Sequence, residues 1–275
     1  MIVILGDVFR DRDVFVSARR ENPERTGQRI WTIHDQQNLP GGAGLLAAIL
    51  RRLMEGQTAI RVLSPILDQH APRKTRYWDV ETGELYGRAD QPDVPYDAAL
   101  WVVCVQAQLD LLNGADALIY CDYGRGASGL AVRTWLAAHL RDGLPIYSTA
   151  RDWPETRAWW WVLNEQELLT VQPQATETAW TEHQWMIETR GKDGSWVSQV
   201  RQGQPRYVQD VRVRIAQETV RSVVGAGDAY LAKLIHTGGD VVAAQRFAEE
   251  FVQMDRRTLK GWLQETEGLT KGVLT

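Results

Sequence analysis

The 275-residue sequence is poor in cysteine, lacks long hydrophobic runs and carries no surplus of positive charge. Its two cysteines, Cys104 and Cys121, are too few for a disulfide framework and too far apart for a Cys-x-x-Cys site, so we expect small core residues. No apolar stretch is long enough to cross a membrane, and no basic region precedes an apolar one at the N-terminus. We therefore expect a cytoplasmic protein with no membrane partner.

Further absences narrow the classes of ligand. A formal net charge of −4 leaves no basic surplus to neutralise a phosphate backbone, which argues against a nucleic-acid partner. The five histidines show no metal-ligand spacing, so we expect no metal bound directly by the protein. No Gly-x-Gly-x-x-Gly follows the first apolar run, which disfavours a Rossmann dehydrogenase. The absence of Gly-x-x-x-x-Gly-Lys-Ser/Thr excludes a P-loop enzyme.

What is present is an alternation of short apolar runs with longer helical patterns. The patterns at 45–54, 98–112 and 130–140 predict helices. The runs predict strands at 2–5, 60–63, 117–121, 146–148, 160–163 and 185–189. This alternation predicts an α/β fold with a mostly parallel sheet covered by helices on both faces.

Two polar segments interrupt the alternation. Residues 14–17 with 29–34, and 73–80 with 84–88, predict hairpin-like strand pairs, and 81–83 is the expected turn of the second pair. We expect one domain over residues 1–275, with a small β-strand lid inserted at about 12–36 and 73–90.

The most informative motif is Gly225-Ala226-Gly227-Asp228, which opens an apolar helical run. Glycines allow a tight turn, and the unbonded N–H groups and dipole of a helix start favour a phosphate-like anion. Asp228 then lies within reach of the group that attacks this phosphate, which suits phosphoryl transfer. Asp228 is the candidate base, and we expect the dipole to stabilise its anion so that it takes the proton late. The alternative is a first-turn acid that only complements the dipole.

Other motifs occur in a defined order along the chain. They are Gly6-Asp7 with Asp11, Pro23-Glu24, Gly41-Gly42, Lys74-Thr75-Arg76, Asp122-Tyr123-Gly124-Arg125-Gly126 and Asn164 to Glu167. Together with the Asp228 motif, this set resembles the ribokinase-like (PfkB-type) carbohydrate kinases over nearly the whole chain. Within them it is most similar to the bacterial heptose-7-phosphate kinases, the kinase half of ADP-heptose synthase. The resemblance implies a ribokinase-like three-layer αβα sandwich.

The same resemblance implies ATP-dependent phosphorylation of a hydroxyl on a sugar or sugar phosphate, with Mg²⁺. The amides of Gly225, Ala226 and Gly227 would hold the transferring phosphoryl group. Asn164 and Glu167 would organise Mg²⁺-bound phosphates through water, although an Asn cap followed by an acid explains the pair equally well locally. The nucleotide-side loop would be formed by Thr189, Gly191 and Gly194, which alone indicate a plain β-turn.

A second group of residues resembles the substrate side of such a site. Asp7, Asp122 and Asn164 each follow a predicted strand, so they fall on one edge of the sheet. The substrate-binding candidates are Asp7, Asp11, Gly41, Gly42, Arg76, Asp122 and Arg125, with Arg20 as a further arginine. The glycines could instead form only a tight turn, and the arginines could be surface charges.

Two departures of the sequence from the family pattern bear on the sugar and on a monovalent cation. Leu45 stands where an asparagine usually binds sugar hydroxyls, and Ser222 stands where an acid usually helps to build a monovalent-cation site. The sugar and the need for a monovalent cation therefore stay open. A catalytically silent relative that binds a sugar or nucleotide as a regulator or interaction module is the alternative hypothesis. A homodimer paired through the lid is a further hypothesis.

Overall fold

A computed structural model describes residues 1–65, 71–91, 98–124, 129–149, 158–171, 183–212 and 214–264. Its strands are β1 (Ile2–Gly6), β2 (Val8–Glu21), β3 (Arg29–Gly42), β4 (Ile60–Leu63), β5 (Arg73–Asp79), β6 (Leu85–Asp90), β7 (Ala117–Cys121), β8 (Ile146–Ser148), β9 (Trp160–Asn164), β10 (Trp185–Thr189), β11 (Ser195–Arg201) and β12 (Gln204–Val211). Its helices are α1 (Ala43–Met54), α2 (Ala98–Ala107), α3 (Leu109–Asn113), α4 (Leu130–His139), α5 (Glu165–Val171), α6 (Ala226–His236), α7 (Val241–Gln253) and α8 (Arg256–Gln264).

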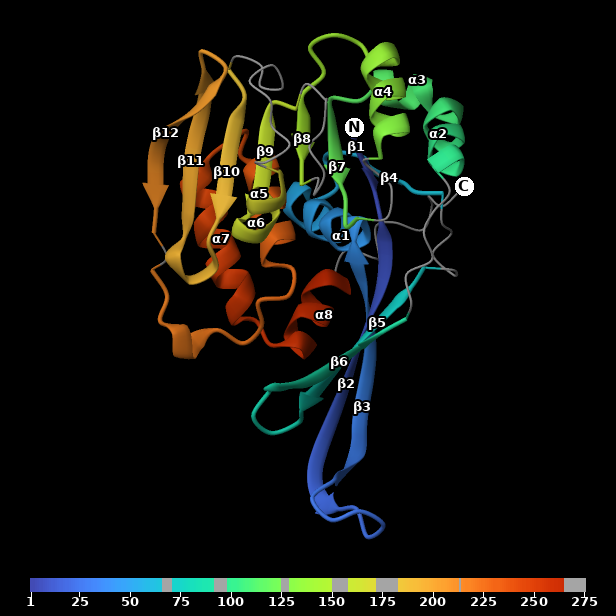
Figure 1. Cartoon of the computed structure of the whole chain (residues 1–275), viewed down its shortest axis with the longest axis vertical. Helices are drawn as coiled ribbons and strands as arrows, with labels where there is room; N and C mark the ends of the chain where they lie inside the picture. Colours follow the sequence, from blue (N-terminus) through green and yellow to red (C-terminus); the bar gives the residue numbers. More distant parts are fainter. Residues whose placement is uncertain are drawn as a thin grey trace.

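The described strands of the body form an eight-stranded sheet in the order β12-β11-β10-β9-β8-β7-β1-β4. In this sheet, β10, β9, β8, β7, β1 and β4 pair with their neighbours in parallel. β11 and β12 add an antiparallel edge. Alternation along β1 sends Ile2 and Ile4 into a core with α1, α6 and α7, and Val3 and Leu5 into a core with α2 and α4. Helices therefore cover both faces (Figure 1), and the predicted three-layer α/β architecture is confirmed.

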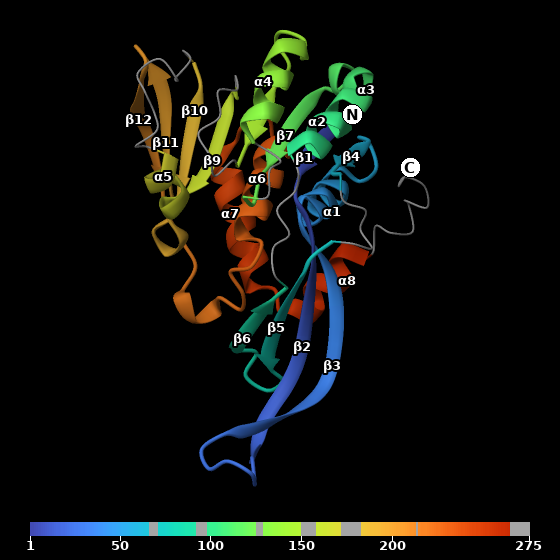
Figure 2. The ribbon, with the colours of Figure 1, turned by 45° about the vertical axis from the view of Figure 1, so that its right-hand side comes forward.

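The lid is a separate sheet in the order β3-β2-β5-β6, and it projects from the body as a long arm (Figures 1 and 2). Its first two strands are longer than the sequence predicts, because β2 begins at Val8, directly after β1, and β3 runs on to Gly42. The buried positions Phe9, Asp11 and Asp13 alternate with half-buried ones, as in any half-buried strand. Two of the three buried residues are acidic, so hydrophobicity alone does not reveal this pattern.

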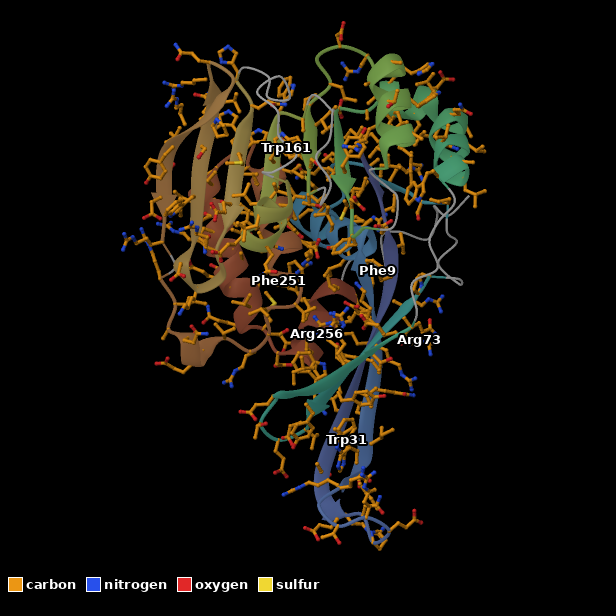
Figure 3. The ribbon with its side chains drawn as sticks, viewed as in Figure 1. Phe9, Trp31, Arg73, Trp161, Phe251 and Arg256 are labelled. Atoms are coloured by element: carbon orange, nitrogen blue, oxygen red, sulfur yellow. The ribbon has the colours of Figure 1, made fainter. Side chains whose placement is uncertain are left out.

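A buried ion pair fixes the root of the lid to the C-terminal helices. Asp13 accepts hydrogen bonds from Arg256 Nε on α8 at 2.9 Å and from Trp78 Nε1 on β5 at 2.8 Å. Both charged side chains are almost fully buried, and Figure 3 shows Arg256 beside the lid strands. Since losing either partner would leave an uncompensated buried charge, this contact ties the lid root to α8.

The cysteines and tryptophans of the body are largely packing residues. Cys121 is buried at the end of β7 as expected, but Cys104 is only half-buried on α2. Trp161 on β9 is buried, and Trp160 stacks on Trp185 of β10 with ring centroids 5.3 Å apart. Among the described residues, no helix has the length and apolarity needed to cross a membrane.

Candidate functional site

The N-terminus of α6 is shaped by two glycines with different roles. Gly225 precedes the helix at φ 85°, and a Cβ there would lie 2.8 Å from Leu45 Cδ2 on α1. Only glycine fits this left-handed, crowded position. A Cβ on Gly227 would meet no atom of the described residues within 4 Å, so these residues leave the space in front of the first turn open.

The backbone amides of this turn are not equivalent. Ala226 N–H donates to the Val223 carbonyl oxygen at 3.2 Å, so it is already engaged within the protein. In the described part of the chain, the N–H groups of Gly227 and Asp228 have no acceptor. Three amides were expected to hold a phosphoryl group, and that of Ala226 already donates a hydrogen bond within the protein. The amide of Asp228, which was not among the three, is available instead.

Asp228 lies in the first turn of α6 with its side chain half-buried. Burial raises the pKa of Asp228 to about 7, a hydrogen bond from Tyr123 opposes this rise, and the nearby charges of Asp11 and Glu167 add to it while Lys74 lowers it. From the sequence alone, the helix dipole was expected to dominate and to keep the anion stable. Desolvation outweighs the dipole here, so Asp228 can accept a proton near neutral pH.

The loop after β7 brings three carboxylates together. Tyr123 donates its N–H to Asp7 Oδ2 at 2.7 Å and its hydroxyl to Asp228 Oδ1 at 2.8 Å. Asp122 accepts the Gly124 N–H at 2.7 Å. Burial raises the pKa of the thiol at the end of β7, and the charges of Asp228, Asp7 and Asp122 raise it further, which places all three near that strand end.

The lid root adds charged side chains to this edge of the sheet. Arg76 on β5 pairs with Asp11 on β2, with Nη1 3.0 Å from Oδ1, and both side chains are buried. Arg76 is therefore oriented by Asp11 and is not a surface charge. Lys74, two residues earlier on β5, lies with Nζ 3.6 Å from the centroid of the Phe9 ring and close enough to Asp228 to affect its pKa.

Gly41 and Gly42 let the end of β3 approach this acidic cluster. A Cβ on Gly42 would lie 2.3 Å from the Asp7 carbonyl oxygen, and Gly42 adopts φ 59°. A Cβ on Gly41 would lie 3.1 Å from Asp11 Cγ. Both glycines are needed for close backbone approach beside the two candidate substrate carboxylates.

Asn164 and Glu167, which the sequence analysis predicted at the phosphates of ATP, form a reciprocal cap at the start of α5. Glu167 N–H donates to Asn164 Oδ1 and Asn164 N–H donates to Glu167 Oε2, each at 2.9 Å. This is the local explanation that the sequence left open. Asn164 is exposed and Glu167 is half-buried, and the charge of Glu167 still reaches Asp228.

The neighbouring strand carries the other residues that were predicted to border the nucleotide. Thr189 at the end of β10 lies in register with Asn164, and its hydroxyl donates to the Leu163 carbonyl at 3.3 Å. Gly191 and Gly194 follow in a tight turn, and a Cβ on Gly194 would lie 2.0 Å from the Val211 carbonyl oxygen. The turn is thus packed against the end of β12.

Neither a family model nor a curated protein sequence matches the chain. Solved structures do match. Phosphofructokinase-2 from Escherichia coli is 12% identical, with 98% of each chain covered and a TM-score of 0.65. A carbohydrate kinase from Agrobacterium tumefaciens is 17% identical over 98% of this chain and 97% of its own, with a TM-score of 0.57. Ribokinase from Arabidopsis thaliana, complexed with ribose and ATP, is 15% identical over 96% and 98%, with a TM-score of 0.56.

The chain has the ribokinase-like fold. At these identities the comparison concerns the fold, and the roles of individual residues rest on their own geometry. In this ribokinase-like chain, the two departures noted in the sequence are both packing residues. Leu45 is buried against Gly225, and buried Ser222 accepts the Val224 N–H at 3.2 Å.

The structure describes only one of the two remaining arginine candidates for the substrate. Arg125 lies outside the described residues. Arg20 is exposed near the far end of β2, opposite Ile30, and so stands on the arm rather than at the lid root.

Two residues of this candidate site were missed as candidates. Tyr123 lies in the loop that contains Asp122, and Lys74 lies in the Lys74-Thr75-Arg76 motif. In each motif only neighbouring residues were predicted to bind the substrate. The sequence did offer a signal for Tyr123, because it directly follows Asp122, the first residue after a buried strand. No local pattern identifies Lys74, because its position depends on how the lid root packs on Phe9.

Proposed function

We propose that this protein transfers the γ-phosphoryl group of ATP to a hydroxyl of a sugar or sugar phosphate, with Asp228 as the base. The observation that carries the proposal is the setting of Asp228. It lies at an open helix start, has a pKa raised to about 7, and faces the charge of Asp11 from the lid. The ribokinase-like neighbours, which include a carbohydrate kinase and a ribokinase complexed with ribose and ATP, support the same reaction class.

In the proposed reaction, Asp7 and Asp11 hold substrate hydroxyls in the acidic cluster. Ionised Asp228 accepts the proton of the attacking hydroxyl as its oxygen bonds to the γ-phosphorus. The bond from that phosphorus to the bridging oxygen breaks, and ADP leaves. The N–H groups of Gly225 and Gly227 and the dipole of α6 stabilise the negative charge on the transferring group.

ATP supplies the phosphoryl group, and the residues present fit its binding. The open space before Gly227 leaves room for a phosphate at the helix start. The exposed Asn164 and the half-buried Glu167 near Asp228 would hold hydrated Mg²⁺ through water, as carboxylates commonly do. The turn that contains Gly191 would border the nucleotide.

The lid root favours an anionic substrate of the heptose-7-phosphate type. Lys74 and Arg76 lie on β5 beside the base and the substrate carboxylates, and Arg76 is already oriented by Asp11. A planar guanidinium and an ammonium group are suited to a sugar phosphate. We extend this role to Arg125 from the resemblance alone, and we place Asp122 in the same substrate-binding group.

The test is ADP release from Mg-ATP across a panel of sugars and sugar phosphates, heptose 7-phosphate included. We expect turnover with one of them, and Asp228→Asn should abolish it while ATP affinity stays within a few-fold. Asp110→Asn makes the same chemical change at an exposed position on α3 and should keep full activity. Binding of ATP or sugar without turnover across the panel would instead support the silent regulator, and an active Asp228→Asn variant would refute the base assignment.

We also propose that two copies pair through the lid. The arm exposes Trp31 by 42% and Ile33 by 61%, together with Leu85 and Tyr86 of β6. Trp31, labelled on the arm in Figure 3, contacts the rings of Tyr77 and Tyr86. Exposed apolar side chains gathered on a projecting sheet favour association with another chain.

Sedimentation velocity tests this pairing. We expect a dimer for the unmodified protein and a monomer for Ile33→Asp, because a charge in an apolar interface is strongly unfavourable. Thr32→Asp introduces the same charge at the preceding residue, whose side chain points to the opposite side of the strand, and should stay dimeric. A monomeric unmodified protein would contradict the proposal.

A further inference from the structure

One tyrosine connects the two groups of carboxylates at the proposed active site. The backbone N–H of Tyr123 holds Asp7 at the end of β1, and the Tyr123 hydroxyl holds Asp228 on α6. Within the described residues, the other carboxylate oxygen of Asp228, Oδ2, makes no hydrogen bond. One oxygen of the base is thus fixed, while the second is available to a substrate hydroxyl.

The ring that carries this hydroxyl is itself held in place. Phe9 meets it edge-on, with ring centroids 5.2 Å apart and planes at 87°. Lys74 Nζ lies over the Phe9 ring at 3.6 Å and 5.4 Å from the centroid of the Tyr123 ring. Phe9 and Lys74 belong to β2 and β5, and Figure 3 shows Phe9 where the lid strands leave the body. The lid root therefore packs against Tyr123, and a phenyl ring at this position keeps these contacts.

We propose that Tyr123 is a positioning residue, whose hydroxyl fixes one oxygen of Asp228 so that the other meets the attacking hydroxyl of the substrate. This inference rests on the proposed function and adds a residue to it. Its physical basis is that a hydrogen bond to a carboxylate restricts the rotation of that group and favours its ionised form. Asp228 without this donor would be less well oriented and would hold its proton to higher pH.

The test is Tyr123→Phe, with two readouts. The first is the pKa of Asp228, followed by carbon-detected NMR of the carboxyl carbon and assigned by its loss in Asp228→Asn. We expect a rise of roughly one unit, since a hydrogen bond to a charged group is worth about that much. The second is kinetic: kcat should fall about tenfold or more, the acid limb of the kcat/KM profile should move to higher pH, and KM should stay within a few-fold.

Tyr120→Phe is the matched control. Tyr120 lies three residues earlier, on β7, and faces the other core, and among the described residues its buried hydroxyl has no hydrogen-bond partner. Its removal should change neither readout. An unchanged Asp228 pKa in Tyr123→Phe overturns the proposal whether or not the protein is a kinase. A raised pKa with unchanged kcat also overturns it.

The two proposals can fail separately. If the unmodified protein phosphorylates nothing on the panel, the proposed function fails. The NMR titration still decides whether Tyr123 controls the ionisation of Asp228.

Discussion

Asp228→Asn is expected to gain stability relative to the unmodified protein as the pH rises to neutral, in addition to inactivating it. An unfolded aspartate has a pKa of about 3.9, whereas the folded value is about 7. The folded state therefore keeps the Asp228 proton at pH values where the unfolded chain has lost it. Stability that is present below about pH 4 is lost as the pH rises to about 7.

The size of this loss follows from the shift. A shift of roughly three pKa units in a fully buried group corresponds to about 4 kcal/mol in the free energy of unfolding. The side chain of Asp228 is partly exposed, so we expect ~1–3 kcal/mol. Asparagine carries no charge at any pH. The free energy of unfolding of Asp228→Asn, minus that of the unmodified protein, should therefore increase by this amount between pH 4.5 and pH 8.

Urea denaturation over this pH range measures the difference. A constant offset between the two proteins reflects packing and hydrogen bonding, so only the change with pH reports on the charge. Asp110→Asn, on exposed α3, should show no such change. A flat difference for Asp228→Asn, or one that shrinks as the pH rises, would refute the conclusion that burial governs the ionisation of this group.

Other substitutions test the lid root and the helix start. Arg256→Met leaves Asp13 buried without its charged partner and should lower the free energy of unfolding by about 3–5 kcal/mol. Arg257→Met, at the exposed neighbour on α8, should cost about 1 kcal/mol or less in the same urea titration. Gly225→Ala should lower both stability, by about 1–3 kcal/mol, and activity, because of its left-handed φ and its crowded surroundings. Gly227→Ala should leave stability within about 1 kcal/mol but lower kcat/KM, because its methyl group enters the open space before α6; a fully active variant would contradict the anion-binding role.

The body of the fold is predictable because its strands and helices have simple periodicities. The apolar runs that became β1 and β7 are buried on both faces, so they appear in the sequence as continuous hydrophobic segments. The lid was harder to predict. Its root has acids on the inward face, and their burial depends on partners distant in the sequence, such as Arg256 for Asp13. No local pattern contains that information.

In the candidate site, too, some features could be predicted from the local sequence and others could not. Gly225 and Gly42 could be identified from the sequence, because a backbone position with positive φ favours glycine over every other residue. The ionisation of Asp228 could not be predicted, since the helix start and its burial have opposite effects on the charge. Deciding which effect is larger requires the positions of Tyr123 and Lys74, and both depend on how the lid root meets the body.

The replacement of the usual asparagine by Leu45 has a consequence for substrate recognition. Leu45 is buried beneath Gly225, so it supports the start of α6 and offers no polar group to a sugar. Under the proposed function, hydroxyl recognition then falls to Asp7 and Asp11, and Asp11 comes from the lid. Because Asp11 is also the ion-pair partner of Arg76, binding of the sugar hydroxyls and of an anionic substituent would be coupled through one carboxylate. Sugar phosphates should therefore be favoured over neutral sugars of the same stereochemistry, by an amount that Arg76→Met reduces.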